Sequence, residues 1–180
     1  VPSHKVSTDN FDAASKAVHY LAKKGYSRIA HLTGPQHINV FGERHRGYLS
    51  AIAALGLTYN NRFVVTTEFD ITDGVQAMAS IWSQPTRPDA VLCDSFTLSA
   101  GVNLFCKTHQ LSVPHHLAII AIANDPFGAL IDPPQTFLEQ PLDEIANSAF
   151  ELLMAQIKSE NPVVFESRLH KARLVERQSV

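Results

Sequence analysis

Four separate positions carry side chains whose chemistry suits the binding of a polar, ring-shaped small molecule. Arg44 offers a guanidinium fork that donates to hydroxyl or carboxylate oxygens, and Phe69 offers an aromatic face for stacking. Further acceptors and donors stand in two other segments: Asp94 with Ser95, and Asn124 with Asp125. A charge-assisted hydrogen bond from such an arginine is typically worth about 1.5–3 kcal/mol. The alternative is that these are ordinary polar loop residues, so the fold must decide whether they meet.

Catalytic and metal-binding alternatives have less support. The chain has no Gly-rich phosphate loop and no Gly-x-Ser-x-Gly motif. Asp94-Ser-Phe-Thr97 resembles the haloacid-dehalogenase phosphotransfer pattern, but Phe96 stands where a second acid is needed. Of the nine histidines only His115 and His116 form a close pair, so we interpret the histidines as solvent-facing or capping, and Cys93 as packed core. We therefore expect no catalytic residues, no metal site and no cofactor.

Predicted strands and helices alternate about four times before Asn124. Apolar runs of strand length predict strands at 28–33, 63–67, 90–93 and 117–122. Apolar residues at helical spacing predict helices at about 10–24, 43–55, 72–82 and 98–105. After Pro133-Pro134 the chain is expected to be extended at 136–139, helical from Pro141, and extended again in a tail from Val163 to Val175.

This alternation predicts an α/β fold with an open, doubly wound parallel sheet. Short strand–helix–strand connections give right-handed crossovers, so consecutive strands run in the same direction. The carboxyl ends of parallel strands share one edge of the sheet, which is where such folds bind ligands. The polar residues that follow the predicted strands should therefore lie along one rim.

Bulk properties limit the class of protein. The 180 residues are 45% hydrophobic and 18% charged, as in ordinary globular domains, and the net charge of −2 gives no electrostatic footprint for nucleic acid. Two cysteines give no disulfide framework, and neither a signal peptide nor an apolar run of about 20 residues is present, so we expect a cytoplasmic location and no membrane contact. Because the first residue is Val1, we expect a segment cut from a longer protein.

Several motifs, in order along nearly the whole chain, resemble the effector domain of the LacI/GalR transcriptional regulators. They are Val6-Ser-Thr-Asp-Asn10, Gly25-Tyr-Ser-Arg-Ile-Ala-His-Leu-Thr-Gly-Pro35, Glu43-Arg-His-Arg-Gly-Tyr48, Arg87-Pro-Asp-Ala-Val-Leu-Cys93, Leu111-Ser-Val-Pro114, Pro133-Pro-Gln-Thr136 with Gln140-Pro141, and Leu174-Val-Glu-Arg177. The resemblance implies a periplasmic-binding-protein-like (type I) fold of two lobes preceded by a helix-turn-helix. Residues 1–136 would form the C-terminal lobe. Residues 137–180 would add a helix that packs on the N-terminal lobe and a returning tail strand, with the N-terminal lobe and DNA-binding domain absent.

The resemblance also implies site residues. Arg44 matches the arginine that grips the effector, Phe69 the aromatic that stacks on it, and Asp9 an acidic residue at the lobe crossover. Ser95, followed by Phe96, stands where the family has Asn-Asp or Ser-Asp. The remaining ligand and dimer-interface residues implied by the family are Asn124 and Asp125 for the ligand, and Leu98, Val102, Phe105, Leu130 and Ile131 for a homodimer.

The leading hypothesis is the ligand-sensing and dimerising domain of a sequence-specific DNA-binding regulator with a small-molecule effector, a sugar or a nucleoside. Operator DNA would be bound through the absent N-terminal domain only. Two alternatives stay open. A periplasmic-type sugar-binding transport protein would need a secretory signal upstream, and a flavodoxin-like enzyme domain would need a paired acid and base on the rim.

Overall fold

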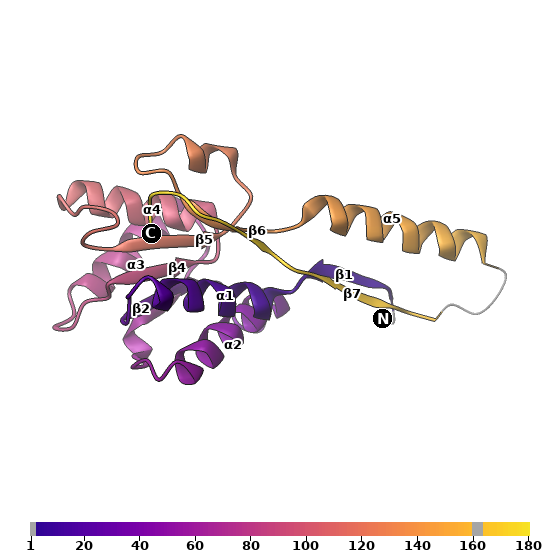
Figure 1. The fold of residues 1–180 in the computed structure, drawn as a ribbon, viewed down its shortest axis with the longest axis horizontal. Helices are drawn as coiled ribbons and strands as arrows, with labels where there is room; N and C mark the ends of the chain where they lie inside the picture. Colours follow the sequence, from indigo (N-terminus) through magenta and orange to yellow (C-terminus); the bar gives the residue numbers. More distant parts are fainter. Residues whose placement is uncertain (1–2, 160–163) are drawn as a thin grey trace.

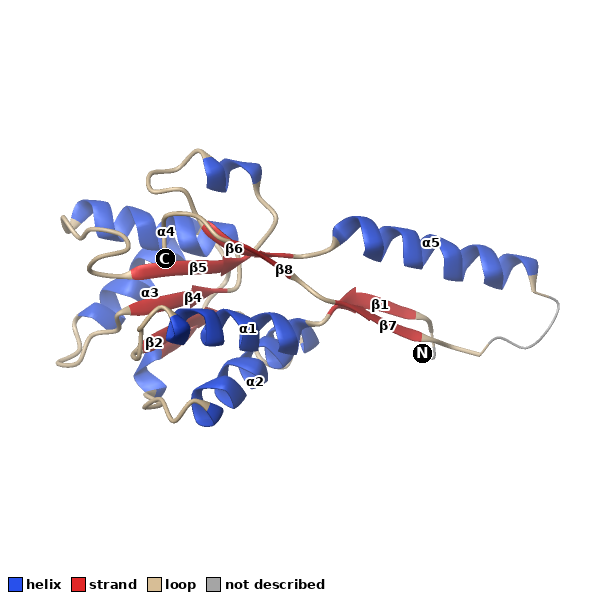
Figure 2. Ribbon diagram, viewed as in Figure 1, coloured by secondary structure: helices blue, strands red, loops and turns tan. Residues whose placement is uncertain are grey.

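The computed structural model describes residues 3–159 and 164–180 and consists of two unequal bodies. The large body is a six-stranded sheet with helices on both faces (Figures 1 and 2). The small body consists of a two-stranded ribbon and one long helix, which lie beyond one end of the large sheet. Extended segments join the two bodies, so the chain passes from one to the other three times.

The large sheet has the strand order β3-β2-β4-β5-β6-β8. Its strands are β2 (Ile29–Thr33), β3 (Val64–Thr66), β4 (Ala90–Cys93), β5 (Ala118–Ile122), β6 (Thr136–Glu139) and β8 (Arg173–Val175). All neighbouring pairs are parallel except β6 and β8, which are antiparallel. The predicted α/β class with a doubly wound parallel sheet is confirmed.

Helices cover both faces of this sheet. On one face lie α1 (Asn10–Lys23) and α2 (Asn39–Ala54), and on the other lie α3 (Ile71–Trp82) and α4 (Phe96–Thr108). Side chains alternate along each buried strand. In β4, Ala90 and Leu92 join the core beneath α1 and α2, whereas Val91 and Cys93 join the core beneath α3 and α4. This is why the buried strands read as continuous apolar runs.

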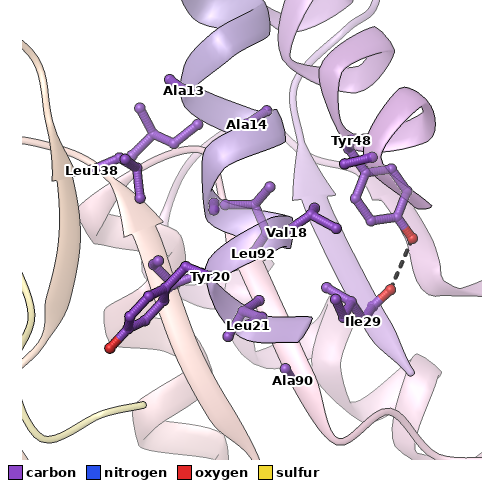
Figure 3. Close-up of a cluster of buried hydrophobic side chains, with 14 of the residues drawn as sticks. Ala13, Ala14, Val18, Tyr20, Leu21, Ile29, Tyr48, Ala90, Leu92 and Leu138 are labelled. Atoms are coloured by element: carbon purple, nitrogen blue, oxygen red, sulfur yellow. Dashed lines mark hydrogen bonds between the residues drawn. The ribbon is translucent and has the colours of Figure 1, made fainter. Parts of the chain in front are cut away.

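Small residues let the helices approach the sheet and one another closely. Ala13 and Ala14 are fully buried where α1 crosses the sheet, beside Leu92 and Leu138 (Figure 3). A Cβ atom at Gly47 of α2 would lie 2.2 Å from the carbonyl oxygen of Phe11, so only glycine permits this contact. The neighbouring Tyr48 is buried and its hydroxyl donates to the carbonyl oxygen of Ile29 at 2.8 Å, which ties α2 to β2 (Figure 3).

The apolar face of α4 packs into the core, which corrects part of the predicted dimer interface. Leu98, Val102 and Phe105 are each fully buried beneath α4. Their prediction as contacts to a second copy is wrong, because the i, i+4, i+7 face that they form is used to cover the sheet. Leu130 is 77% exposed and Ile131 is partly exposed, so both remain available to a partner.

The small body pairs β1 (Lys5–Thr8) with β7 (Ser167–His170) in parallel and places α5 (Leu142–Lys158) against this ribbon. The predicted extended tail begins at Val163, which lies outside the described residues, and continues into β7 and β8. Most of α5 remains uncovered: Phe150, Leu153 and Ile157 are each more than half exposed. Among the described residues, no helix is both long enough and apolar enough to cross a membrane.

Three connections between the bodies, which we call the crossovers, are hydrogen-bonded to one another. The backbone N–H of Asp9 donates to the carbonyl oxygen of His170 at 2.8 Å. The hydroxyl of Thr8 donates to Oε1 of Gln140 at 3.2 Å. The chain segments after β1, β6 and β7 are therefore held side by side, next to the edge of the large sheet where β5 and β6 end.

Candidate functional site

The candidate site lies on the rim, by which we mean the carboxyl ends of β2 to β5 and the loops that follow them. Arg44, Phe69, Asp94 and Asn124 all belong to these loops or to the helices that start from them. Because the four strands are parallel, their carboxyl ends fall on the same edge of the sheet, the edge that faces the crossovers (Figure 1). The rim therefore brings together residues that are far apart in the sequence.

Arg44 is buried on the rim and is fixed by two hydrogen bonds. Its side chain is 4% exposed, and α2 starts five residues earlier, so Arg44 lies in the second turn of the helix rather than opening it. Nε donates to Oδ1 of Asn10 at 2.9 Å, and Nη1 donates to the carbonyl oxygen of Asp94 at 2.7 Å. Nη2 makes no hydrogen bond to any residue that the structure describes. Burial lowers the pKa of Arg44 and the nearby Asp94 opposes that shift, and the guanidinium stays charged at neutral pH.

The carboxylate of Asp94 is enclosed beneath this guanidinium. Its Oδ1 lies 3.1 Å from Nε2 of His31 and 4.0 Å from Nη1 of Arg44, and its Oδ2 accepts from the hydroxyl of Thr33 at 2.6 Å. Burial acts to raise the pKa of Asp94, but His31, Arg44 and Thr33 together more than offset it, and the pKa is lowered. Asp94 is therefore an ionised carboxylate in the interior.

His31 belongs to this buried cluster, which corrects the prediction that the histidines are solvent-facing or capping. It is fully buried, its Nε2 faces Asp94, and its Nδ1 has no hydrogen-bond partner among the described residues. The ring of His45 stacks on it with centroids 5.8 Å apart. Burial, with a smaller contribution from His31, lowers the pKa of His45. The alternation of β2 explains the placement, since Ile29, His31 and Thr33 point to the same side.

Phe69 and Phe41 form an aromatic wall beside Arg44. Their rings stack with centroids 4.7 Å apart. Both rings lie close to Gly34, where a Cβ atom would lie 2.4 Å from Cε2 of Phe69. Phe69 adopts a φ of 74°, which non-glycine residues rarely adopt, and its carbonyl oxygen accepts from the hydroxyl of Thr97 at 2.7 Å. Phe41 precedes Arg44 by three residues on α2, so the wall and the guanidinium share a face of that helix.

Three other predicted ligand residues cap helices. Asp9 accepts from the backbone N–H of Asp12 at 3.0 Å, Ser95 from that of Leu98 at 3.2 Å, and Asp125 from that of Phe127 at 2.9 Å. A short polar side chain just after a strand is well placed to satisfy the first N–H groups of the next helix. A contact of these residues with a ligand stays a prediction.

Asn124 is bonded to a crossover. Its Nδ2 donates to the carbonyl oxygen of Gln140 at 2.7 Å, and its Oδ1 accepts from the backbone N–H of Gln140 at 2.7 Å. A cavity of about 420 Å³ lies beside this pair, between Glu139, Asp143 and Arg173. Asn124 thus links the end of β5 to the segment between β6 and α5, and its role toward a ligand stays a prediction.

Sequence reasoning missed the residues that position Arg44. Asn10 appeared only within a motif that resembles the LacI/GalR regulators, and Asp94 was expected, with Ser95, to face a ligand rather than to lie beneath Arg44. Phe41 and His31 were not assigned to the site at all. The signal available for His31 was its position inside an apolar run of strand length, where a polar side chain must have a buried partner.

Similarity to known proteins shows the family of this chain. The profile of the periplasmic binding protein-like domain family matches residues 18–180. The chain belongs to this family. The curated relative "HTH-type transcriptional repressor CytR" of Escherichia coli K12 is 33% identical over 174 residues, covering 97% of this chain and 51% of the relative. The ribose operon repressor of the same organism is 32% identical over 153 residues, covering 85% and 46%.

Solved structures of transcriptional regulators share the fold of this chain. A regulatory protein of the LacI family from Chloroflexus aggregans superposes with a TM-score of 0.90 at 25% identity, covering 99% of this chain and 65% of that one. The transcriptional regulator CelR in complex with cellobiose gives a TM-score of 0.89 at 27% identity, covering 100% and 56%. The resemblance to the LacI/GalR effector domain is confirmed. The chain spans about half the length of the curated relatives that it matches.

The partly buried imidazole of His45 predicts a specific loss of stability in acid. Burial lowers the pKa of His45 in the folded chain below the ordinary 6.5. At any pH between the lowered pKa and 6.5, the unfolded chain therefore binds this proton more readily than the folded chain does. The free energy of unfolding should therefore decrease as the pH falls through this window. Urea unfolding at a series of pH values should show a shallower decrease for His45→Gln than for the wild type.

The exposed His37 supplies the control, because His37→Gln should leave the slope of the wild type unchanged. An equally steep loss of stability in His45→Gln and the wild type would contradict the buried, uncharged state of His45.

Proposed function

We propose that this chain is the effector-sensing and dimerising domain of a sequence-specific DNA-binding transcriptional regulator, with a sugar or a nucleoside as effector. The observation that carries the proposal is Arg44, a buried guanidinium fixed by Asn10 and Asp94 with Nη2 left to bond with a ligand, next to the aromatic wall of Phe41 and Phe69. An arginine fork and an aromatic face are the groups that a polar ring needs for orientation and stacking.

The relatives support a regulator over the alternatives. Those reported above are repressors by name, and one neighbouring regulator holds cellobiose, a sugar. A transport protein shares the fold family but lacks this support. The acid and the imidazole that lie together near the rim, Asp94 and His31, are both fully buried and so do not face a substrate. We propose that operator DNA is bound by a helix-turn-helix outside this chain, in the bacterial cytoplasm.

We propose that the effector acts by changing how the two bodies sit relative to each other. We propose that residues 9–136 together with β8 form the C-terminal lobe, and that β1, α5 and β7 belong with the N-terminal lobe. The boundary expected at residue 136 therefore fits α5 but not β1 or β8. A ligand held between lobes favours whichever lobe arrangement it binds more tightly. The hydrogen-bonded crossovers lie next to the rim, so a change at the rim would reach them directly.

The homodimer is proposed on the exposed apolar residues near α4. Phe127 is 63% exposed, Leu130 is 77% exposed and Leu104 of α4 is 46% exposed. Beside them, a cavity of about 470 Å³ is lined by Leu104, Ile131 and Pro133 among others. Apolar side chains gathered in this way on a surface are typical of protein contacts.

Removal of Arg44 should weaken effector binding. We expect Arg44→Ala to weaken the affinity for any sugar or nucleoside that binds by about tenfold to a hundredfold, the value of one lost charge-assisted hydrogen bond. Calorimetry on the full-length protein with pentoses, hexoses, disaccharides and nucleosides measures this. The exposed Arg62→Ala is the control, and far-UV circular dichroism checks the fold. Unchanged affinity in a folded Arg44→Ala protein would remove Arg44 from the site.

A charge at position 130 should disrupt the dimer. Leu130→Asp would bury a carboxylate in the apolar contact, so the dissociation constant of the dimer should rise by about tenfold or more. Analytical ultracentrifugation of the full-length protein measures it, with Tyr59→Asp on the loop after α2 as control. A dimer equally stable in Leu130→Asp and the wild type would place the interface elsewhere.

A further inference from the structure

We infer that Phe69 is held in its stacking position before any ligand binds, and that Thr97 and Asp73 are the positioning residues that hold it. This inference rests on the proposed function, in which Phe69 stacks on the effector, and goes further by assigning roles to two residues outside the aromatic wall. The backbone conformation of Phe69 and the hydrogen bonds around it carry the assignment.

The backbone of Phe69 has an unfavourable conformation. Its φ of 74° lies in the left-handed region, where the Cβ atom crowds the backbone. Glycine has no Cβ atom, and asparagine and aspartate can form local hydrogen bonds there, but phenylalanine has neither advantage. Such a conformation persists only where the surrounding contacts fix it, and residues of this kind cluster at ligand sites. The neighbours of Phe69 must therefore hold it in place.

The carboxylate of Asp73 holds the chain on both sides of Phe69. Its Oδ2 accepts from the backbone N–H of Glu68 at 2.7 Å and from that of Asp70 at 3.3 Å. The carboxylate is itself fixed, because the backbone N–H of Asp73 donates to Oδ1 of Asp70 at 2.7 Å in a reciprocal cap of α3. The residues before and after Phe69 are thus tied to a single side chain.

Thr97 holds the carbonyl group of Phe69 itself. Its hydroxyl donates to that carbonyl oxygen at 2.7 Å. A hydroxyl has one proton, so in the 2.9 Å contact between Oγ1 of Thr97 and Oγ of Ser95 it is Ser95 that donates. Oγ of Ser95 accepts in turn from the backbone N–H of Leu98 at 3.2 Å. The carbonyl of Phe69 is therefore tied to the first turn of α4.

The two helices that supply these contacts are fixed to each other. A Cβ atom at Gly74 of α3 would lie 2.4 Å from the carbonyl oxygen of Leu98, and one at Gly101 of α4 would lie 2.2 Å from that of Ile71. Only glycine permits backbones to approach so closely. The first turns of α3 and α4 therefore form one support for the loop that carries Phe69.

An aromatic ring that is already in place binds a ligand without first being ordered. If the hydroxyl of Thr97 is removed, the backbone of Phe69 is free to relax from its unfavourable conformation. Only the fraction of molecules that keep the ring in place then binds the ligand, and the apparent affinity falls in proportion to that fraction. Loss of this hydroxyl should therefore weaken binding although the hydroxyl is bonded to the protein.

Variants of Thr97 in the full-length protein test its role. The probes are D-ribose, D-glucose, cellobiose and adenosine, each measured by calorimetry. For each probe that binds, we expect Thr97→Val to weaken the affinity about fivefold, the value of one lost hydrogen bond, and Thr97→Ser, which keeps the hydroxyl, to stay within about twofold of the wild type. The control is Thr108→Val, which removes an exposed hydroxyl at the other end of α4 and should leave the affinity unchanged.

A double-mutant cycle with Phe69→Ala separates positioning from a general effect on the fold. In the Phe69→Ala background, Thr97→Val should no longer weaken binding, because no ring remains to be positioned. An equal loss in both backgrounds, or no loss in the wild-type background, overturns the role of Thr97 and leaves the proposed function standing. A folded Phe69→Ala protein with wild-type affinity overturns the stacking role of Phe69 and this inference with it. Absence of binding by every probe overturns the proposed function and this inference together.

Urea unfolding tests the held conformation without a ligand. At an ordinary loop position alanine is more stable than glycine, because glycine loses more conformational entropy on folding. At the φ of Phe69 the order should reverse, so Phe69→Gly should unfold at a higher urea concentration than Phe69→Ala. This difference should shrink in the Asp73→Ala background, where the loop can relax. An alanine variant at least as stable as the glycine variant overturns the held conformation, and an undiminished difference in the Asp73→Ala background overturns the role of Asp73.

Discussion

The buried guanidinium of Arg44 is the constraint on which the site depends. A charge enclosed to this extent is strongly destabilising unless its donors are satisfied, so Asn10 and Asp94 must both be in place. Asn10 in turn donates to the carbonyl oxygen of Thr8, whose hydroxyl bonds to Gln140. A continuous chain of hydrogen bonds therefore runs from Arg44 to the crossovers, and the position of the small body and the orientation of Arg44 are linked.

Much of the fold follows from short-range patterns in the sequence. The apolar runs at 90–93 and 117–122 predicted buried strands, and the structure has strands at Ala90–Cys93 and Ala118–Ile122. The start of α2 was predicted four residues late, because Ile38 precedes it without a capping side chain and gives no signal. Periodicity showed that α4 has an apolar face but not what covers it. The family resemblance implied that Leu98, Val102 and Phe105 contact a second copy, whereas in the structure they pack against the sheet.

The candidate site was only half predictable. Arg44 and Phe69 stand out as single large side chains after strand ends, and the structure places both on the rim. The partners of Arg44 are 34 and 50 residues away, and no local pattern connects residues so far apart. Polar residues after a strand look alike in sequence whether they cap a helix, as Ser95 does, or ionise beneath an arginine, as Asp94 does. Only the three-dimensional arrangement separates the two roles.

The exchange rate of the Nε–H proton of Arg44 with water tests the central claim most directly. It can be measured near neutral pH from the side-chain signals in a ¹H–¹⁵N spectrum, with Asn10→Ala to assign the bond that protects it. The account predicts slow exchange for Arg44, fast exchange for the exposed Arg62, and loss of the protection in Asn10→Ala. Exchange as fast at Arg44 as at Arg62 would show that the guanidinium is not held, and would contradict the account.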